Sequence, residues 1–299
     1  MKNFFKLDKP TFSFEIFPPK GKGDLSQIFN TVDALASLDP DLISVTYGAG
    51  GGTSAYTLDI GSSRENTAEI ASRIQRDYAI PALAHLTCIG STRDEMRATL
   101  DALRDKGIQN ILAMRGDIVG EGTKDFSHAS DLIKFINENY DFHIFAACYP
   151  EKHIEAYSME EDLKYLKAKC ECGVDALISQ LFFDNEHFYE FRDRARALGI
   201  TQRIEAGIMP ITSPAQINKM VTLCGASVPA GVQKLLRAYG HNAMAMREAG
   251  IAYATAQIID LLASGVDGIH LYTMNQPEIA KRICENIRGV LYSLRVKRG

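Results

Sequence analysis

Short runs of apolar and β-branched residues recur along the whole chain. Eight such runs are present, and they cover residues 11–17, 41–46, 80–87, 110–114, 143–148, 175–181, 203–209 and 267–272. Their near-continuous hydrophobicity is typical of strands that are buried on both faces of a parallel sheet. The pattern therefore predicts eight parallel strands.

The segments between these runs carry helical patterns. In residues 24–38 the 3.6-residue period is followed by Leu25, Ile28, Phe29, Val32 and Leu35. N-terminal capping patterns occur at Thr92 with Glu95, at Ser158 with Glu161, and at Ser213 with Pro214. A glycine is expected to end a helix just before the next strand at Gly107, Gly173, Gly199, Gly225 and Gly265.

This regular alternation favours an α/β fold with a closed (β/α)8 architecture, a TIM barrel. An open doubly wound sheet would carry a glycine-rich phosphate loop after its first strand, but here the turn is Phe17-Pro18-Pro19-Lys20. The long stretch 211–266 predicts two or three extra helices between strands seven and eight. We expect residues 1–299 to form a single catalytic domain with its active site at the C-terminal ends of the strands.

Composition and charge exclude several classes of protein. The net charge of −4 argues against a nucleic-acid partner and against a polybasic membrane anchor. No apolar run reaches about 18 residues, so we expect no transmembrane helix. Six scattered cysteines suit a reducing, cytoplasmic compartment. The spacing of Cys170 and Cys172 fits a zinc knuckle poorly, so no metal is expected.

The first strand contains an acidic residue, Glu15. Alternation places it on the same face as Ser13 and Phe17, within an aromatic-rich segment. A buried carboxylate is costly unless it is functional or paired, and burial favours its neutral form, which suits a general acid. An ion pair with a lysine or arginine of another strand is the alternative explanation.

The other strand ends are also polar. The residues concerned are His85 on the third strand, Arg115 and Asp117 after the fourth, Tyr149 and His153 after the fifth, Gln180 after the sixth, and Tyr272 at the end of the eighth. They show no metal-ligand spacing, nucleophile elbow or strand-end Schiff-base lysine. Hydrogen-bonding groups among aromatic side chains suit a large planar cofactor and a planar substrate.

Eight segments in register make the chain recognisable. They are FSFEIFPPKG, ISVTYGAGGGT, PALAHLTC, ILAMRGD, AACYPEKH, ISQLFFD, GIMPI and HLYTMN. Over residues 12–287 the chain resembles bacterial-type methylenetetrahydrofolate reductases. The resemblance implies a flavin-dependent reduction of 5,10-methylenetetrahydrofolate to 5-methyltetrahydrofolate by NADH or NADPH. Non-covalent FAD would carry the hydride in a ping-pong cycle.

The resemblance also implies roles for individual residues. Glu15 would be the general acid, and Asp117 would lie near both the flavin and the folate. Gln180 would belong to the pocket shared by folate and nicotinamide, and Gln216 and Tyr272 would contact the folate. The positions that match FAD contacts are Thr46, His85, Arg115, Gly116, Asp117, Ala129, Tyr149, His153, Asp162 and Lys169.

Three positions depart from the family pattern. His128 replaces a frequent tyrosine, Gln276 replaces an arginine, and Met220 replaces a phenylalanine that stacks on ligands in some members. We expect these changes to affect nucleotide preference and polyglutamate affinity while leaving the reaction intact. The resemblance further implies a homo-oligomer, and a chain of this length leaves no room for the regulatory domain of animal relatives.

Two other functions remain open from the sequence. A barrel lyase or aldolase acting on a small oxo acid would work without flavin and would need a lysine or a metal at its site. A folate-binding barrel without redox activity would keep the pocket but would not be reduced by NADH or NADPH.

Overall fold

The computed structural model describes residues 9–19, 25–47, 60–116 and 125–296 of the chain. Strands and helices alternate along these segments. In chain order they are β1 (Thr11–Ile16), α1 (Ser26–Ala36), β2 (Leu42–Val45), α2 (Ile60–Tyr78), β3 (Ala82–Thr87), α3 (Arg93–Asp105), β4 (Asn110–Met114), α4 (Ala129–Asn139), β5 (His143–Cys148), α5 (Met159–Glu171), β6 (Ala176–Ser179), α6 (Asn185–Ala197), β7 (Arg203–Ile208), α7 (Pro214–Cys224), α8 (Ala230–Tyr239), α9 (Ala243–Ala263), β8 (Gly268–Tyr272) and α10 (Pro277–Val296).

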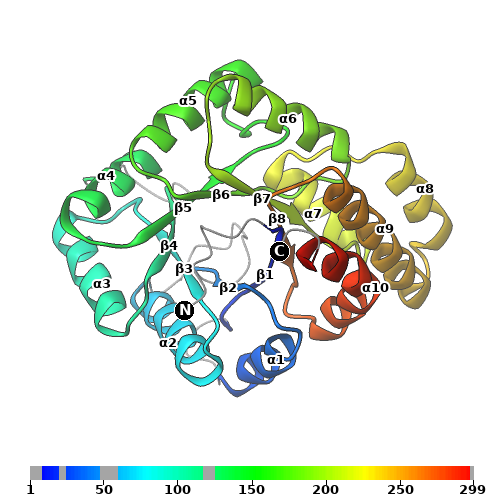
Figure 1. Cartoon of the computed structure of the whole chain (residues 1–299), viewed down its shortest axis with the longest axis horizontal. Coiled ribbons are helices and arrows are strands. Elements are labelled where there is room, and N and C mark those ends of the chain that lie inside the picture. The colour runs from blue at the N-terminus through cyan, green and yellow to red at the C-terminus, as the bar shows by residue number, and fades with distance from the viewer. Residues whose placement is uncertain (1–8, 20–24, 48–59, 117–124, 297–299) are drawn as a thin grey trace.

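The strands form one closed parallel barrel, and the helices surround it (Figure 1). Each strand pairs with the next in sequence, and β8 closes the barrel against β1 with Ser13 opposite His270 and Glu15 opposite Tyr272. The predicted (β/α)8 barrel is therefore confirmed. The extra helices between strands seven and eight are α7, α8 and α9, which lie together beside β7 and β8.

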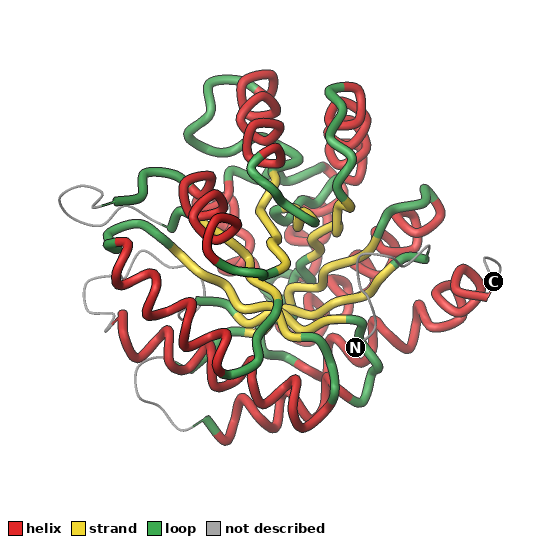
Figure 2. Tube along the Cα trace, turned by 60° about the vertical axis from the view of Figure 1, so that its left-hand side comes forward, coloured by secondary structure: helices red, strands yellow, loops and turns green. Residues whose placement is uncertain are grey.

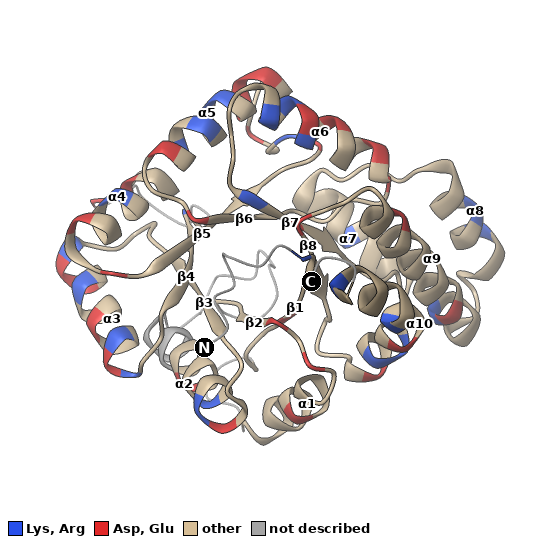
Figure 3. Cartoon of the chain, viewed as in Figure 1, with Lys and Arg blue, Asp and Glu red and all other residues tan. Residues whose placement is uncertain are grey.

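The apolar core has two main layers, one inside the barrel and one between the strands and the outer helices. The inner layer consists of Leu42, Leu83, Leu112, Phe145, Ala176 and Ile178. The outer layer includes Phe14 and Ile16, which alternate with Ser13 and Glu15 along β1. Figure 2 shows the strands at the centre of this arrangement, and Figure 3 shows charged residues gathered on outer helices such as α3 and α5. Within the described ranges, no helix has the length and apolar character needed to span a bilayer.

Of the two predicted capping boxes, the one at α3 is complete and the one at α5 is only half formed. At α3 the Thr92 side chain accepts from the Glu95 N–H, while the Glu95 carboxylate accepts from the Thr92 N–H, as predicted. At α5 the Ser158 hydroxyl accepts from the Glu161 N–H. The Glu161 carboxylate, however, accepts from the N–H of Tyr157. The second box is therefore wrong in its reciprocal half, because Glu161 reaches one residue further back.

The other predicted helix starts and ends are confirmed with one exception. Ser213 caps α7, and Pro214 occupies its first turn. Positive φ angles, which glycine adopts without steric cost, occur before the following strand at Gly107, Gly173, Gly199 and Gly265. Gly225 also has a positive φ, of 69°, but it precedes α8 rather than a strand. Its predicted position before a strand is wrong because three helices fill the last crossover.

A buried polar cluster lies at the N-terminal end of the barrel. The Thr11 hydroxyl donates to Oε1 of Glu205, a fully buried residue of β7, over 2.6 Å. Arg203 Nη2 is 3.9 Å from the same oxygen, whereas Glu205 Oε2 has no hydrogen-bond partner among the described residues. Burial raises the pKa of the Glu205 carboxyl to about 7. The folded protein therefore holds the Glu205 proton more tightly than an exposed glutamate would.

Candidate active site at the C-terminal ends of the strands

The Glu15 carboxylate lies inside the barrel between two histidines. Its Oε2 atom is 3.6 Å from Nε2 of His85 on β3 and 3.5 Å from Nε2 of His270 on β8. Both imidazoles are buried, while the Glu15 side chain keeps 19% of its surface exposed. Among the described residues no lysine or arginine forms an ion pair with Glu15. The alternative explanation of a strand-to-strand ion pair with a fixed cation is therefore not the arrangement seen here.

Two serines hold these imidazoles in place. Ser44 Oγ is 2.6 Å from His85 Nε2, and Ser13 Oγ is 2.8 Å from His270 Nδ1. Burial lowers the pKa of His85 to about 4, although the nearby Glu15 opposes this effect. His85 is therefore neutral near pH 7, and the centre carries no fixed positive charge from this ring.

The segment after β8 fixes the backbone of β1. The Thr273 hydroxyl donates to the carbonyl of Glu15 over 2.6 Å. The Asn275 side chain accepts from the Phe17 N–H at 3.0 Å and donates to the Phe17 carbonyl at 2.8 Å. Met274 and Asn275 adopt left-handed φ angles of 52° and 53°. Such angles cost free energy in non-glycine residues and persist where surrounding contacts enforce them. The contacts of Thr273 and Asn275 therefore act as a clamp that fixes the backbone position of Glu15.

Tyr272 connects β8 to β6 across the intervening strand. Its hydroxyl donates to the Ser179 carbonyl over 2.7 Å, and burial raises its pKa well above the usual range. A Cβ atom at Gly207 of β7 would lie 2.9 Å from the Tyr272 hydroxyl oxygen and 2.3 Å from the Ser179 oxygen. A glycine is needed at this position because any side chain would displace the tyrosine ring.

A charged pair stands at the end of β4. Arg115 Nη1 and Nη2 each lie 2.7 Å from a carboxylate oxygen of Glu155, which belongs to the segment between β5 and α5. Gly116 follows with a φ of 87°, and a Cβ atom there would come within 3.0 Å of the Thr87 side chain. The backbone after β4 therefore passes close to β3, and a guanidinium is held at the mouth of the barrel.

A second polar cluster joins β5 to α5. The rings of Tyr149 and His153 meet edge to face with centroids 4.7 Å apart, and the His153 N–H donates to Asp162 Oδ2 over 3.0 Å. Lys169 Nζ donates to the Ala147 carbonyl over 2.6 Å. Burial lowers the pKa of Lys169 and of His153 and raises that of Asp162. The structure thus brings together four of the predicted FAD-binding residues.

The remaining predicted residues are spread around the same end of the barrel. Thr46 follows β2, and its carbonyl accepts from the Thr67 hydroxyl over 2.9 Å. Ala129 is the first residue of α4. The backbone N–H of Gln180 donates to the Cys148 carbonyl over 2.7 Å. Asp117, predicted to serve both catalysis and binding, lies outside the described residues.

The side-chain amide of Gln216 makes hydrogen bonds within the protein that the sequence did not predict. Its Oε1 atom accepts from both the backbone N–H and the hydroxyl of Thr212, each over 2.8 Å. Its Nε2 atom donates to the Pro210 carbonyl over 3.3 Å. The Gln216 amide therefore holds the segment between β7 and α7, while its second Nε2 hydrogen remains available to donate to a ligand.

The three departures from the family pattern occupy different surroundings. His128 is the exposed residue before α4, and its N–H donates to Asp131 Oδ2. Met220 packs against the apolar cluster beneath α7, α8 and α9. Gln276 donates its backbone N–H to the Thr273 carbonyl, next to the segment that clamps Glu15.

Sequence reasoning missed His270, Ser44 and Glu155. A signal for His270 was available, because alternation along the eighth strand places it on the same face as Tyr272. Ser44 could have been found in the same way on the second strand. Glu155 lies in an irregular segment, where no period predicts direction.

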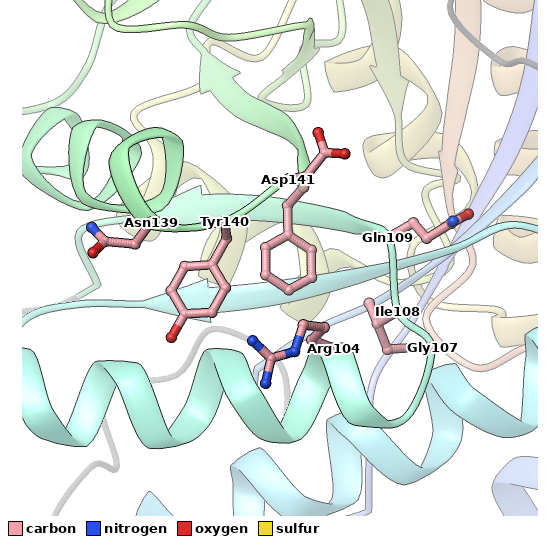
Figure 4. Close-up of a pocket in the computed structure, with 8 residues that line it drawn as sticks. Arg104, Gly107, Ile108, Gln109, Asn139, Tyr140 and Asp141 are labelled. Atoms are coloured by element: carbon pink, nitrogen blue, oxygen red, sulfur yellow. The ribbon is translucent and has the colours of Figure 1, made fainter.

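A surface cavity of about 360 Å³ lies at the opposite end of the barrel (Figure 4). Its lining comes from Arg104 and from residues 107–109 and 139–142, which precede β4 and β5. The Arg104 guanidinium carbon lies 5.9 Å from the Tyr140 ring centroid, and the Tyr140 hydroxyl donates to Asp101. In barrels of this type the N-terminal end contributes to stability, so this cavity is not the candidate active site.

Comparison with known proteins identifies the family of this chain. A family model described as Methylenetetrahydrofolate reductase matches residues 1–288. The chain belongs to the methylenetetrahydrofolate reductase family. It is 35% identical over 275 residues to the 5,10-methylenetetrahydrofolate reductase of Escherichia coli, with 92% of this chain and 90% of that protein covered. The enzyme named methylenetetrahydrofolate reductase (NADH) 1 from Arabidopsis thaliana is 34% identical, but this chain spans only 51% of its length.

Solved structures support the fold alone. A protein from Clostridium thermocellum, described as binding two copies of 5-methyl-5,6,7,8-tetrahydrofolic acid, superposes with a TM-score of 0.65 at 16% identity. The alignment covers 97% of this chain and 98% of that one. A dihydropteroate synthase from Coxiella burnetii superposes with a TM-score of 0.51 at 10% identity, covering 95% of each chain.

Proposed function

We propose that this protein reduces 5,10-methylenetetrahydrofolate to 5-methyltetrahydrofolate with electrons from NADH or NADPH, carried by bound FAD. The observation that carries the proposal is the position of Glu15, a partly exposed carboxyl on the barrel interior beside the buried imidazoles of His85 and His270. Membership of the family and the names of its bacterial relatives support the same reaction. The alternative of a lyase or aldolase without flavin has no such support.

The residues at the ends of β4 and β5 fit a flavin dinucleotide. Arg115, His153 and Lys169 supply cationic or hydrogen-donating groups. Burial lowers the pKa of His153, and the charges of Arg115 and Lys169 lower it further. Lys169 is a buried ammonium that donates to a neutral carbonyl, so a nearby phosphate would offset its desolvation. Asp162 can accept from a ribose hydroxyl. These residues would hold FAD, which when bound supplies the hydride transfer between nicotinamide and folate.

The chain itself supplies a proton and positions it. Opening the methylene bridge of the substrate breaks a carbon–nitrogen bond, and the departing nitrogen needs a proton. Glu15 would donate it: its O–H bond breaks, and the folate N–H bond forms. The resulting electrophilic iminium accepts the hydride, so one hydride and one proton are consumed in each turnover. The clamp from Thr273 and Asn275 keeps Glu15 at a fixed depth for this transfer.

A visible spectrum of the purified protein tests the proposal. Flavin absorption that bleaches anaerobically with NADH or NADPH, and returns on addition of methylenetetrahydrofolate, is the expected result. A colourless protein that gains no activity after FAD is added would contradict the flavin role and leave the lyase alternative. A flavin that no nicotinamide reduces would instead favour a folate-binding barrel without this redox cycle.

A further inference from the structure

The two histidines beside Glu15 are not equivalent. Their Nε2 atoms stand at nearly equal distances from Glu15 Oε2, 3.6 Å for His85 and 3.5 Å for His270. The His85 nitrogen already has a partner, because Ser44 Oγ lies 2.6 Å away. The His270 nitrogen is buried and has no hydrogen-bond partner among the described residues. Its unused hydrogen-bonding capacity is directed at the Glu15 carboxyl.

The contacts of Ser13 favour the tautomer of His270 that carries its hydrogen on Nδ1. The Ser13 hydroxyl donates to the Ile269 carbonyl over 3.3 Å and lies 2.8 Å from His270 Nδ1. A carbonyl can only accept, and a hydroxyl has one hydrogen to give. With that hydrogen directed at Ile269, Ser13 accepts from His270 Nδ1–H. The Nε2 atom of the neutral ring then presents a lone pair to Glu15.

A lone pair in this place discriminates between the two forms of Glu15. A carboxylic acid can donate its O–H to His270 Nε2 and so satisfy a buried acceptor. A carboxylate would face that lone pair with its own negative charge and leave the nitrogen unpaired. The separation of 3.5 Å is longer than a normal hydrogen bond, and catalytic contacts often tighten only when substrate binds.

We propose that His270, oriented by Ser13, is a positioning residue that keeps Glu15 in its protonated form. The role of Glu15 as proton donor to folate rests on the proposed function, whereas the hydrogen bond itself does not. In each cycle Glu15 loses its proton to the folate nitrogen and regains one from water at its exposed side. The hydrogen bond to His270 thus favours the return of a proton to Glu15 after each turnover.

Other groups around Glu15 need to be considered in any pH dependence. Among the described residues, the titratable side chains that face it are His85 from β3 and both His270 and Tyr272 from β8. His85 is neutral near pH 7 because of burial, and Tyr272 is kept in its phenol form for the same reason.

Infrared difference spectroscopy tests the hydrogen bond without any turnover. The spectrum of the purified protein minus that of Glu15→Gln should show the carbonyl band of a protonated carboxylic acid at pH 7. In His270→Phe the same band should reach half intensity at a pH lower by about one unit, which is the roughly tenfold effect of one lost hydrogen bond. His143→Phe is the matched control, because His143 begins β5 and is exposed at the other end of the barrel.

The pH profile of folate reduction gives a second readout. In His270→Phe the limb on which the rate falls with rising pH should move to lower pH by about one unit, so activity is rescued by acid. Reduction of the flavin by nicotinamide should keep its wild-type rate. Should His270→Phe not fold, Ser13→Ala keeps the test open: the ring can then turn its N–H toward Glu15, and the limb should move in the same direction.

The outcomes separate this inference from the proposed function. An infrared band that is unchanged in both variants, or that moves to higher pH, overturns the role of His270 even if the enzyme reduces folate normally. An absence of flavin or of folate reduction in the wild-type protein contradicts the proposed function, and the infrared result still decides whether His270 holds the Glu15 proton.

Discussion

Arg115 and Glu155 form a two-pronged ion pair at the mouth of the barrel, with both N···O distances at 2.7 Å. The pair joins the end of β4 to the segment that follows β5. The same guanidinium is one of the groups that we propose for the FAD pyrophosphate. Glu155 therefore places a negative charge where a second anion is expected to bind.

Removing that charge should strengthen FAD binding. In Glu155→Gln the guanidinium no longer has a competing carboxylate, and we expect the FAD dissociation constant to fall by about two- to five-fold, since the pair is partly exposed and screened. Quenching of FAD fluorescence on titration with apoprotein would measure it. Glu190→Gln, which breaks an exposed pair with Arg194 on α6, is the control. Weaker binding in Glu155→Gln would show that the pair helps to build the site.

Glu15→Gln should separate the two halves of the catalytic cycle. Glutamine keeps the size of the side chain but cannot donate a carboxyl proton, so folate reduction should fall by about 10²-fold or more. Flavin reduction by nicotinamide needs no proton from Glu15 and should continue at a similar rate. Anaerobic stopped-flow measurement of each half-reaction checks this, and equal losses in both would assign Glu15 a structural role instead.

The candidate site was predictable to the extent that strand periodicity defines direction. Alternation placed Glu15 on the same face as Ser13, and the structure shows that this face is the barrel interior, where Glu15 lies beside His85. The partners Ser44 and His270 follow from the same rule, but only once strand register is known. Glu155 could not be predicted, because an irregular segment has no repeating geometry that relates residue number to direction.

The buried Glu205 should make stability depend on pH. Burial raises its pKa from 4.5 to about 7, so the folded state holds this proton more tightly than the unfolded state. Stability from this group is complete below pH 4.5 and is lost as pH rises through 7, by on the order of 3 kcal/mol. Denaturant unfolding at pH 5 and pH 8 measures the loss.

In Glu205→Gln that dependence should largely disappear, because the neutral amide mimics the protonated acid at every pH. The variant should therefore gain stability relative to wild type at pH 8 and differ little from it at pH 5. The exposed Glu190→Gln should keep the wild-type dependence. A Glu205→Gln protein with the same loss between pH 5 and pH 8 would assign the effect to another group.

Two helical glycines should respond oppositely to alanine. A Cβ atom on Gly250 of α9 would lie 1.7 Å from the carbonyl oxygen of Ile211, so Gly250→Ala should destabilise the protein by about 2–3 kcal/mol. Gly289 of α10 has nothing within 4 Å of such an atom, and Gly289→Ala should stabilise by about 0.5–1 kcal/mol. Thermal melts of both variants compare them directly, and similar changes in the two would contradict the packing of α9 against Ile211.

The architecture was more predictable than its details. The predicted strands at residues 110–114 and 143–148 match β4 and β5 residue for residue, because buried parallel strands have a strong and continuous apolar pattern. The capping box at Ser158 was half wrong because Glu161 had two neighbouring N–H groups within reach. Residue spacing alone cannot tell which of these two N–H groups Glu161 will accept from. The conformation of the chain before α5 decides it.

The pairing of β1 with β8 has a consequence for how the chain is made. Among the eight described strands, β1 is synthesised first and its partner β8 last. During translation one edge of β1 stays open, with unpaired backbone groups that can recruit strands from other nascent chains. That edge can be covered only once β8 has been made, and the pairing that covers it is the one that brings Ser13 to His270.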